Sequence, residues 1–140
     1  MTQAFEAKGG CLCGAVSFTA AQARRSIGAC HCDMCRNWSG GPFIGVHCGS
    51  EVIFQGENSI SVYDSSAWAE RGFCRRCGSH LFYRLKENRH HFVPVGLFAD
   101  QDRFTLDRQS YIDCKPAYYD FANDTRDMTR AEMLEKYGKS

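Results

Sequence analysis

The chain has 140 residues, a mass of 15.8 kDa, nine cysteines and a formal net charge of +1. This length fits one domain, residues 1–140, with a core that needs no disulfide staples, and the near-neutral charge gives no global attraction for nucleic acid or an anionic membrane. The longest apolar stretch, residues 92–99, is far shorter than the ~18–20 residues of a membrane span, and the first residues lack the pattern of a secretory signal. The odd number of cysteines also argues against a disulfide framework, so we expect reduced thiols in a cytoplasmic protein.

Short strands dominate the predicted elements. Alternating apolar and β-branched residues between Gly-rich turns predict a mostly β domain of antiparallel sheets. Pro94 predicts that its strand lies at a sheet edge or at a bulge. The expected strands, in chain order, are residues 15–20, 42–48, 51–55, 59–63, 69–73, 80–85, 91–98 and 109–115.

The C-terminal segment has a different pattern. Residues 120–127 are polar and predict a loop. Thr129 and Glu132 then have the spacing of a capping box, and the apolar residues that follow share one helical face. A short C-terminal helix that ends at Gly138 is therefore expected.

Seven of the nine cysteines fall in three short groups, which are Cys11/Cys13, Cys30/Cys32/Cys35 and Cys74/Cys77. Cys74-x-x-Cys77-Gly78 between two predicted strands is typical of a zinc knuckle, in which a tight turn directs two thiolates at one ion. A redox C-x-x-C motif normally opens a helix, whereas a strand follows here, so metal binding is favoured. A closed structural site needs four ligands, and Cys11 and Cys13 are the natural second pair. The alternative is that these two cysteines are ordinary buried residues.

The remaining group, Cys30, Cys32 and Cys35, can converge on one ion from a single loop. A three-ligand site leaves one coordination position open, which is the pattern of catalytic zinc. The alternative is a structural site that Cys48, His47 or His31 completes as a fourth ligand. Three thiolates make zinc a poor source of hydroxide, but the ion can still bind an external thiol as thiolate. The chemistry expected of an open site is therefore carbon–sulfur bond formation or cleavage at an electrophilic carbon such as an aldehyde.

These motifs together resemble the glutathione-dependent formaldehyde-activating enzyme family, which also has centromere-protein-V-like members. The resemblance runs in order from about Gly9 to Ser79. It rests on Gly10-Cys11-Leu12-Cys13-Gly14, on Cys30-His31-Cys32-x-x-Cys35-Arg36, and on Arg71-Gly72-Phe73-Cys74-x-x-Cys77-Gly78-Ser79.

The resemblance implies an Mss4-like fold of antiparallel β-sheets organised around two Zn²⁺ ions. It implies a structural zinc at Cys11, Cys13, Cys74 and Cys77, and a catalytic zinc at Cys30, Cys32 and Cys35. The implied activity is the addition of glutathione to formaldehyde, which gives S-hydroxymethylglutathione and is classed as carbon–sulfur lyase. A related small electrophile is an equal substrate candidate, because the motifs define the metals rather than the pocket.

Four neighbouring residues have candidate roles beside the metals. The side chain of His31 is expected to point away from the ion and to support the ligands or pack, with proton transfer as an alternative. Arg36 and Arg71 are candidates for binding a carboxylate of glutathione, with plain surface charge as the alternative. Trp38 is a candidate wall of the open site. Cys48 and Cys114 are expected to be buried free thiols.

Two other classes of protein remain as alternatives. One is a non-catalytic zinc-binding interaction module, which needs an exposed apolar patch. The other is a nucleic-acid-binding zinc protein, which overall neutrality and the absence of a base-stacking motif disfavour. Its candidate basic strip is Arg75, Arg76, Arg84, Lys86, Arg89, His90 and His91.

Overall fold

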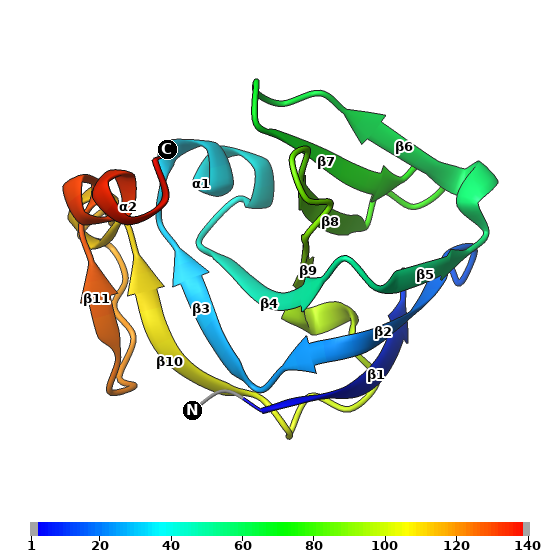
Figure 1. The fold of residues 1–140 in the computed structure, drawn as a ribbon, viewed down its shortest axis with the longest axis horizontal. Helices are drawn as coiled ribbons and strands as arrows, with labels where there is room; N and C mark the ends of the chain where they lie inside the picture. Colours follow the sequence, from blue (N-terminus) through cyan, green and yellow to red (C-terminus); the bar gives the residue numbers. More distant parts are fainter. Residues whose placement is uncertain (1–2, 139–140) are drawn as a thin grey trace.

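Strands are the commonest secondary structure in the computed structural model, which describes residues 3–138 (Figure 1). The helices within this part of the chain are α1 (Asp33–Ser39), α2 (Arg130–Tyr137) and the 3-10 helices η1 (Glu57–Ser59), η2 (Val95–Leu97) and η3 (Ile112–Cys114). The strands are β1 (Ala4–Gly10), β2 (Ser17–Arg24), β3 (Ser26–Cys30), β4 (Phe43–Gly49), β5 (Val52–Gln55), β6 (Ile60–Tyr63), β7 (Ala69–Cys74), β8 (His80–Leu85), β9 (His91–Pro94), β10 (Thr105–Ser110) and β11 (Arg126–Met128).

The strands form two sheets. One has the order β1-β2-β5, and the other has the order β11-β10-β3-β4-β9-β8-β7-β6. Figure 1 shows the larger sheet as a curved wall that runs from β11 to β6, and β2 of the smaller sheet packs against β4. The mostly β fold is therefore confirmed. The strand pairs of both sheets are antiparallel except those of β10, which runs parallel to both β3 and β11. A long connection after β9 brings the chain back to the side of β3 that β4 does not occupy.

Most strand predictions are confirmed, and the differences have local causes. The predicted strand 91–98 ends at Pro94, because residues 95–97 turn as η2. Since β9 lies between β4 and β8, Pro94 marks the end of an inner strand rather than an edge or a bulge. The strand expected at 109–115 is β10, which ends at residue 110 before η3. The strand expected at 15–20 begins two residues later and extends to Arg24.

Besides the three 3-10 helices, four elements were not predicted, namely β1, β3, α1 and β11. The sequences of β1 and β3 are rich in Ala and Gly, and therefore lack the β-branched alternation that marks a strand. Strand β11 begins at Arg126, inside the segment 120–127 that was expected to be a loop. The C-terminal helix is confirmed, with the Thr129–Glu132 capping box and a left-handed Gly138 at its end.

The buried residues form two clusters. The main core contains Val16, Phe18, Val46 and Leu81, and fills the space between the two sheets together with Phe82. A second, smaller cluster is aromatic and sulfur-rich, with Cys32, Cys35, Phe43 and Tyr111 at its centre. None of the helices within residues 3–138 has the length and apolar character that a membrane crossing requires.

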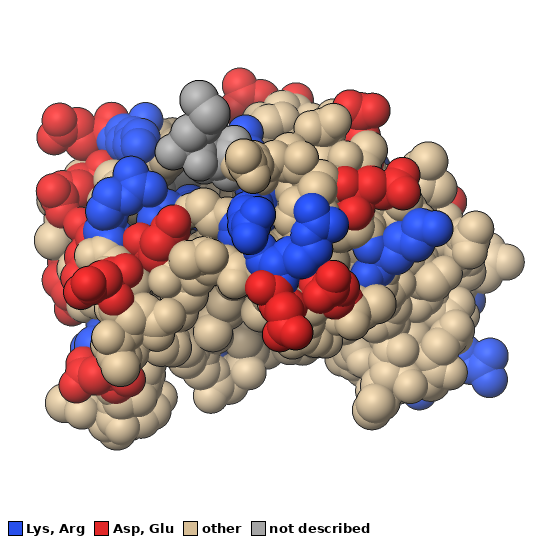
Figure 2. Space-filling model, turned by 90° about the horizontal axis from the view of Figure 1, so that it is seen from below, with Lys and Arg blue, Asp and Glu red and all other residues tan. Residues whose placement is uncertain are grey.

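The candidate basic strip is not a continuous positive surface. Arg84 and Arg89 both pair with Glu70, and Lys86 pairs with Asp64. His91, the last member of the candidate strip, is buried. Figure 2 shows a face of the molecule on which basic and acidic side chains are mixed. This charge pattern gives no support to a nucleic-acid-binding function.

Two left-handed glycines offer a matched test of the packing beside the paired ends of β2 and β5 in the smaller sheet. Gly56 has φ 82° and Gly49 has φ 65°, so alanine is strained at either position, by about 1–2 kcal/mol. A Cβ at Gly56 would also lie 1.9 Å from the carbonyl oxygen of Ala15, whereas a Cβ at Gly49 meets nothing within 4 Å. We expect Gly56→Ala to lower the free energy of unfolding, measured with urea, clearly more than Gly49→Ala. Equal losses would contradict this account of the contact.

Candidate metal centres

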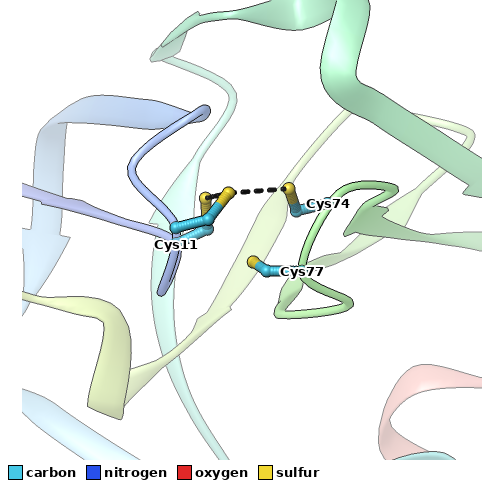
Figure 3. Close-up of side chains that lie close together, drawn as sticks. Cys11, Cys74 and Cys77 are labelled. Carbon is cyan, nitrogen blue, oxygen red and sulfur yellow. Dashed lines mark hydrogen bonds between the residues drawn. The ribbon is translucent and has the colours of Figure 1, made fainter.

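Four cysteine sulfurs meet between two turns. Cys11 and Cys13 lie in the turn after β1, and Cys74 and Cys77 come from the turn between β7 and β8 (Figure 3). All four Sγ atoms lie within 4.8 Å of one another, and the Sγ–Sγ distances are 3.7 Å for Cys11–Cys13 and 3.8 Å for Cys13–Cys74. Two sulfurs bound tetrahedrally to one zinc at about 2.3 Å are about 3.8 Å apart. The four free thiols therefore have the spacing of a closed metal site.

Backbone groups hold this four-cysteine cluster in place. The N–H of Val16 donates to the Sγ of Cys11 at 3.3 Å, which disperses thiolate charge. The N–H of Leu12 donates to the Oγ of Ser79 at 3.1 Å and so joins the two turns directly. Gly78 has φ 79°, which the second turn requires and glycine adopts without strain.

The other three clustered cysteines also converge. Cys30 is the last residue of β3, Cys32 is the N-cap of α1 and Cys35 lies in the first turn of this helix. Their sulfurs lie within 4.8 Å of one another, and the N–H of Cys35 donates to the Sγ of Cys32 at 3.4 Å. The segment is thus a strand end and a helix start, rather than the single loop that the sequence predicted. The helix was missed because it has only seven residues.

None of the three candidates for a fourth ligand joins this cluster within the described residues. Cys48 is fully buried in the main core and bonds to the carbonyl oxygen of Val46, and burial raises the pKa of its thiol to about 12. His47 contacts His90 through ring nitrogens 3.1 Å apart, and burial lowers the pKa of His47 to about 4. His31 has both of its ring nitrogens engaged elsewhere.

His31 belongs to a hydrogen-bond chain that does not include the cysteine sulfurs. Gln109 donates from Nε2 to Thr125, so its Oε1 accepts from His31 Nε2 at 2.7 Å. The Nδ1 atom of His31 then accepts from the hydroxyl of Tyr119, also at 2.7 Å. His31 is fully buried, and desolvation lowers its pKa, so the ring is neutral. This chain fixes the residue between Cys30 and Cys32.

The three thiols oppose one another's ionisation. Hydrogen bonds to Cys32 and Cys35 raise the pKa of Cys30, since its proton is shared with them and their charges oppose a further one. The same contacts lower the pKa of Cys32, because Cys30 and Cys35 donate to its sulfur. Three anionic sulfurs within 4.8 Å of one another need a divalent ion to offset their repulsion. Both cysteine clusters can therefore hold a metal ion.

Arg71 lies against the three-cysteine cluster. It is only 3% exposed, and its Nη2 donates to the Sγ of Cys35 at 3.6 Å. Its guanidinium carbon lies 4.9 Å from the ring centroid of Trp38 and 4.8 Å from that of Tyr83. The Trp38 ring stacks in turn on His80. Trp38 and Tyr83 thus enclose a buried cation beside the sulfurs, so Arg71 is not a surface charge.

The guanidinium of Arg36 already bonds to groups of the protein, whereas a residue that binds a substrate carboxylate needs free N–H groups. Its Nε donates to the carbonyl oxygen of His31 at 2.9 Å, and its Nη2 donates to Asp33 at 2.8 Å. The side chain therefore braces the cysteine segment. Cys114 is half-buried, and the guanidinium of Arg130 donates to its sulfur.

Several residues around the three-cysteine cluster have no motif that could reveal them. Tyr83 comes from β8 and Gln109 from β10, so only the sheet brings them to the cluster. Tyr111 is buried with φ 56°, which is rare for a residue other than glycine, and burial raises its pKa to about 12. Tyr119 lies in a segment that the sequence left unassigned. The chemistry-bearing cysteines were visible in the sequence, but their surroundings were not.

The family model described as "Glutathione-dependent formaldehyde-activating enzyme" matches residues 6–114, a range that contains all nine cysteines. The chain therefore belongs to the glutathione-dependent formaldehyde-activating enzyme family. It is 34% identical over 135 residues to an uncharacterized lyase of Schizosaccharomyces pombe, an alignment that covers 96% of this chain and 98% of that protein. It also resembles the crystal structure of a Rhodobacter sphaeroides protein, with a TM-score of 0.52 and 28% identity, over 66% of this chain and 87% of the other.

Two adjacent tyrosines test the role of the hydrogen-bond chain. Tyr119→Phe removes the hydroxyl that donates to His31, and we expect it to lower the free energy of unfolding by about 1 kcal/mol. Tyr118→Phe is the matched control, because Tyr118 is 75% exposed and should tolerate the change. Denaturant unfolding at constant metal content measures both values. A loss in Tyr118→Phe as large as that in Tyr119→Phe would contradict the account.

Proposed function

We propose that this protein is a zinc-dependent lyase that forms or cleaves the carbon–sulfur bond of a thiol adduct. The proposed reactants are glutathione and formaldehyde, or a related small electrophile, and the proposed product is the S-hydroxymethyl adduct. The main support is the difference between the two clusters, four cysteines in one and three in the other, within the described residues. Membership of the family and the lyase relative support the same class of reaction.

The four-cysteine cluster, Cys11, Cys13, Cys74 and Cys77, is proposed as a structural zinc site. Four thiolates saturate a tetrahedral ion, which leaves no position for a reactant. The cluster joins β1 of the smaller sheet to the β7–β8 turn of the larger sheet. Its proposed role is to hold the two sheets in register.

The three-cysteine cluster, Cys30, Cys32 and Cys35, is proposed as the catalytic zinc site. A zinc ion bound there would supply an open position that holds an external thiol as its thiolate. The protein's own contribution is to fix the three sulfurs through the α1 cap and through His31, and to enclose them with aromatic side chains. Enclosure excludes water, which would otherwise compete for the electrophile.

Trp38 and Arg71 are proposed as substrate contacts, because both lie beside this cluster. Arg36 is proposed instead to support the cysteine segment, since its guanidinium already bonds to His31 and Asp33. A cytoplasmic location fits the proposal, because the nine free thiols need a reducing compartment.

Metal analysis of cysteine variants tests the assignment of the two sites. We expect two zinc ions per chain in the wild type and one in Cys35→Ser, because two thiolates and a serine hydroxyl bind zinc weakly. Cys74→Ser is expected to lower thermal stability strongly, since the four-cysteine site joins the sheets. The control is Cys48→Ala, a buried cysteine outside both clusters, which should keep both ions. A single zinc in the wild type would contradict the proposal.

Cobalt substitution tests whether the second site accepts a thiol. We expect glutathione to alter the visible spectrum of the cobalt-loaded wild type, because an added thiolate completes the coordination of the open ion. The cobalt spectrum of Cys35→Ser, in which only the four-cysteine site is filled, should not respond. If glutathione leaves the wild-type spectrum unchanged, the non-catalytic interaction module becomes the better explanation.

Exchange spectroscopy tests the reaction itself. In NMR, we expect the zinc-loaded protein to speed the interconversion of formaldehyde plus glutathione with S-hydroxymethylglutathione. Cys35→Ser should lose this acceleration, whereas Cys48→Ala should keep it. Acceleration by Cys35→Ser equal to that of the wild type would contradict catalysis at this cluster.

A further inference from the structure

Arg71 has a buried nitrogen with no hydrogen-bond partner. Within residues 3–138, only Nη1 of Arg71 and Nε of Arg108 are buried side-chain nitrogens or oxygens without one. The Arg108 side chain is 42% exposed and bonds through Nη2 to the carbonyl oxygen of Ser26, whereas Arg71 is 97% buried. Among these described residues, no carboxylate pairs with Arg71 either. A charged donor left unpaired in a protein interior is strongly destabilising, so this atom has the character of a ligand contact.

The position of Nη1 is fixed by its neighbours. Nη2 of the same guanidinium donates to the Sγ of Cys35, so Nη1, which is bonded to the same carbon, lies in the immediate neighbourhood of the three-cysteine cluster. The rings of Trp38 and Tyr83, at 4.9 and 4.8 Å, hold the guanidinium in place. The Trp38 ring is itself fixed by stacking on His80 with centroids 3.8 Å apart. A donor held this firmly needs no reorganisation when a ligand arrives.

The number of available donors selects the ligand. A carboxylate of glutathione is normally bound by two parallel N–H groups of one guanidinium. Here one of the two Nη atoms is engaged by Cys35, and deep burial leaves little room for a bulky peptide carboxylate. A single unpartnered nitrogen suits a single oxygen atom. In the proposed reaction, the oxygen that comes to lie beside the sulfurs is the carbonyl oxygen of the aldehyde.

We propose that Nη1 of Arg71 binds the carbonyl oxygen of a small aldehyde and stabilises the alkoxide that forms during addition. In this step the thiolate sulfur attacks the carbonyl carbon, the C–S bond forms and the π pair of the C=O bond moves to oxygen. The alkoxide then takes a proton from water, which balances the proton that the thiol released on ionising. Cleavage of the adduct is the same step in reverse. This inference rests on the proposed lyase function and adds an oxyanion contact to it.

The negative charge of the three-cysteine cluster favours the same role for Arg71. Three protein thiolates and a divalent ion would carry a net charge of −1, and a bound substrate thiolate would add one more negative charge, so the Arg71 guanidinium would offset part of the total. An alkoxide that forms beside the thiolates would face their repulsion without this cation. The guanidinium therefore serves two anions at once, the sulfur of Cys35 through Nη2 and the substrate oxygen through Nη1.

Arg71→Lys tests the proposal, because lysine keeps the charge but lacks the two-pronged geometry. We expect the variant to keep two zinc ions and the response of its cobalt spectrum to glutathione. The rate of adduct cleavage should fall about 100- to 1000-fold, the usual effect of losing one oxyanion donor. The matched control is Arg84→Lys on the neighbouring strand, whose guanidinium pairs with Glu70 away from the cluster, and it should stay within twofold of wild type. A rate for Arg71→Lys within twofold of wild type, or loss of the second zinc, would overturn the proposal.

A measurement on the unmutated protein keeps the proposal falsifiable if Arg71→Lys does not fold. Formate is a suitable probe, because it is as small as formaldehyde, unlike a peptide carboxylate, and one of its two oxygens is enough to accept from Nη1. Titration of formate into the zinc-loaded protein should shift the guanidinium ¹⁵N signals of Arg71 and leave those of Arg84 unchanged. Unshifted Arg71 signals would overturn the oxygen site. A formate shift without any effect of glutathione on the cobalt-loaded wild type would support the oxygen site and reject the lyase function.

Discussion

The convergence of four sulfurs from two distant turns is the contact on which the arrangement of the sheets depends. Cys11 and Cys13 follow β1 in the smaller sheet, while Cys74 and Cys77 lie between β7 and β8 in the larger one. Cys13 and Cys74 are 61 positions apart, and the segment between them includes β3, α1 and β4, which carry or adjoin the second cluster. A metal ion bound by the first cluster, as proposed, would close this long loop and remove many conformations of the unfolded chain. It would thereby limit the freedom of the segment that presents the second cluster.

The second cluster has a more specialised environment. Its sulfurs lie in a small aromatic core of their own, separate from the main core. One buried cation, Arg71, contacts the sulfurs, whereas a buried histidine, His31, lies between two of the cysteines and bonds away from them. The cation affects the charge of the cluster, and the histidine fixes the backbone between Cys30 and Cys32. Arg71 lies in β7, and His31 directly follows β3.

The sequence predicted the two cysteine clusters well and their surroundings poorly. Cysteine spacing is a local signal, so the division into clusters of four and three could be read directly, and the mostly β class followed from alternation in strands such as residues 80–85. The same local signal could not show that Arg71 is buried, because a single arginine on a strand looks like surface charge until its neighbours are known. It also missed β1 and β3, whose Ala- and Gly-rich sequences pair because the adjoining strands require partners. The parallel run of β10 depends on how the chain returns after η2, which no pattern in β10 itself encodes.

The hydrogen-bond chain behind the cysteine segment crosses a boundary in the sequence. His31 and Gln109 lie inside the residues that the family model matches, whereas Tyr119 and Thr125 lie beyond them. Residues beyond the range that the family model matches therefore help to hold His31, which lies between Cys30 and Cys32 inside that range. The position of the backbone between Cys30 and Cys32 thus depends on side chains outside the matched range, which no cysteine motif would reveal.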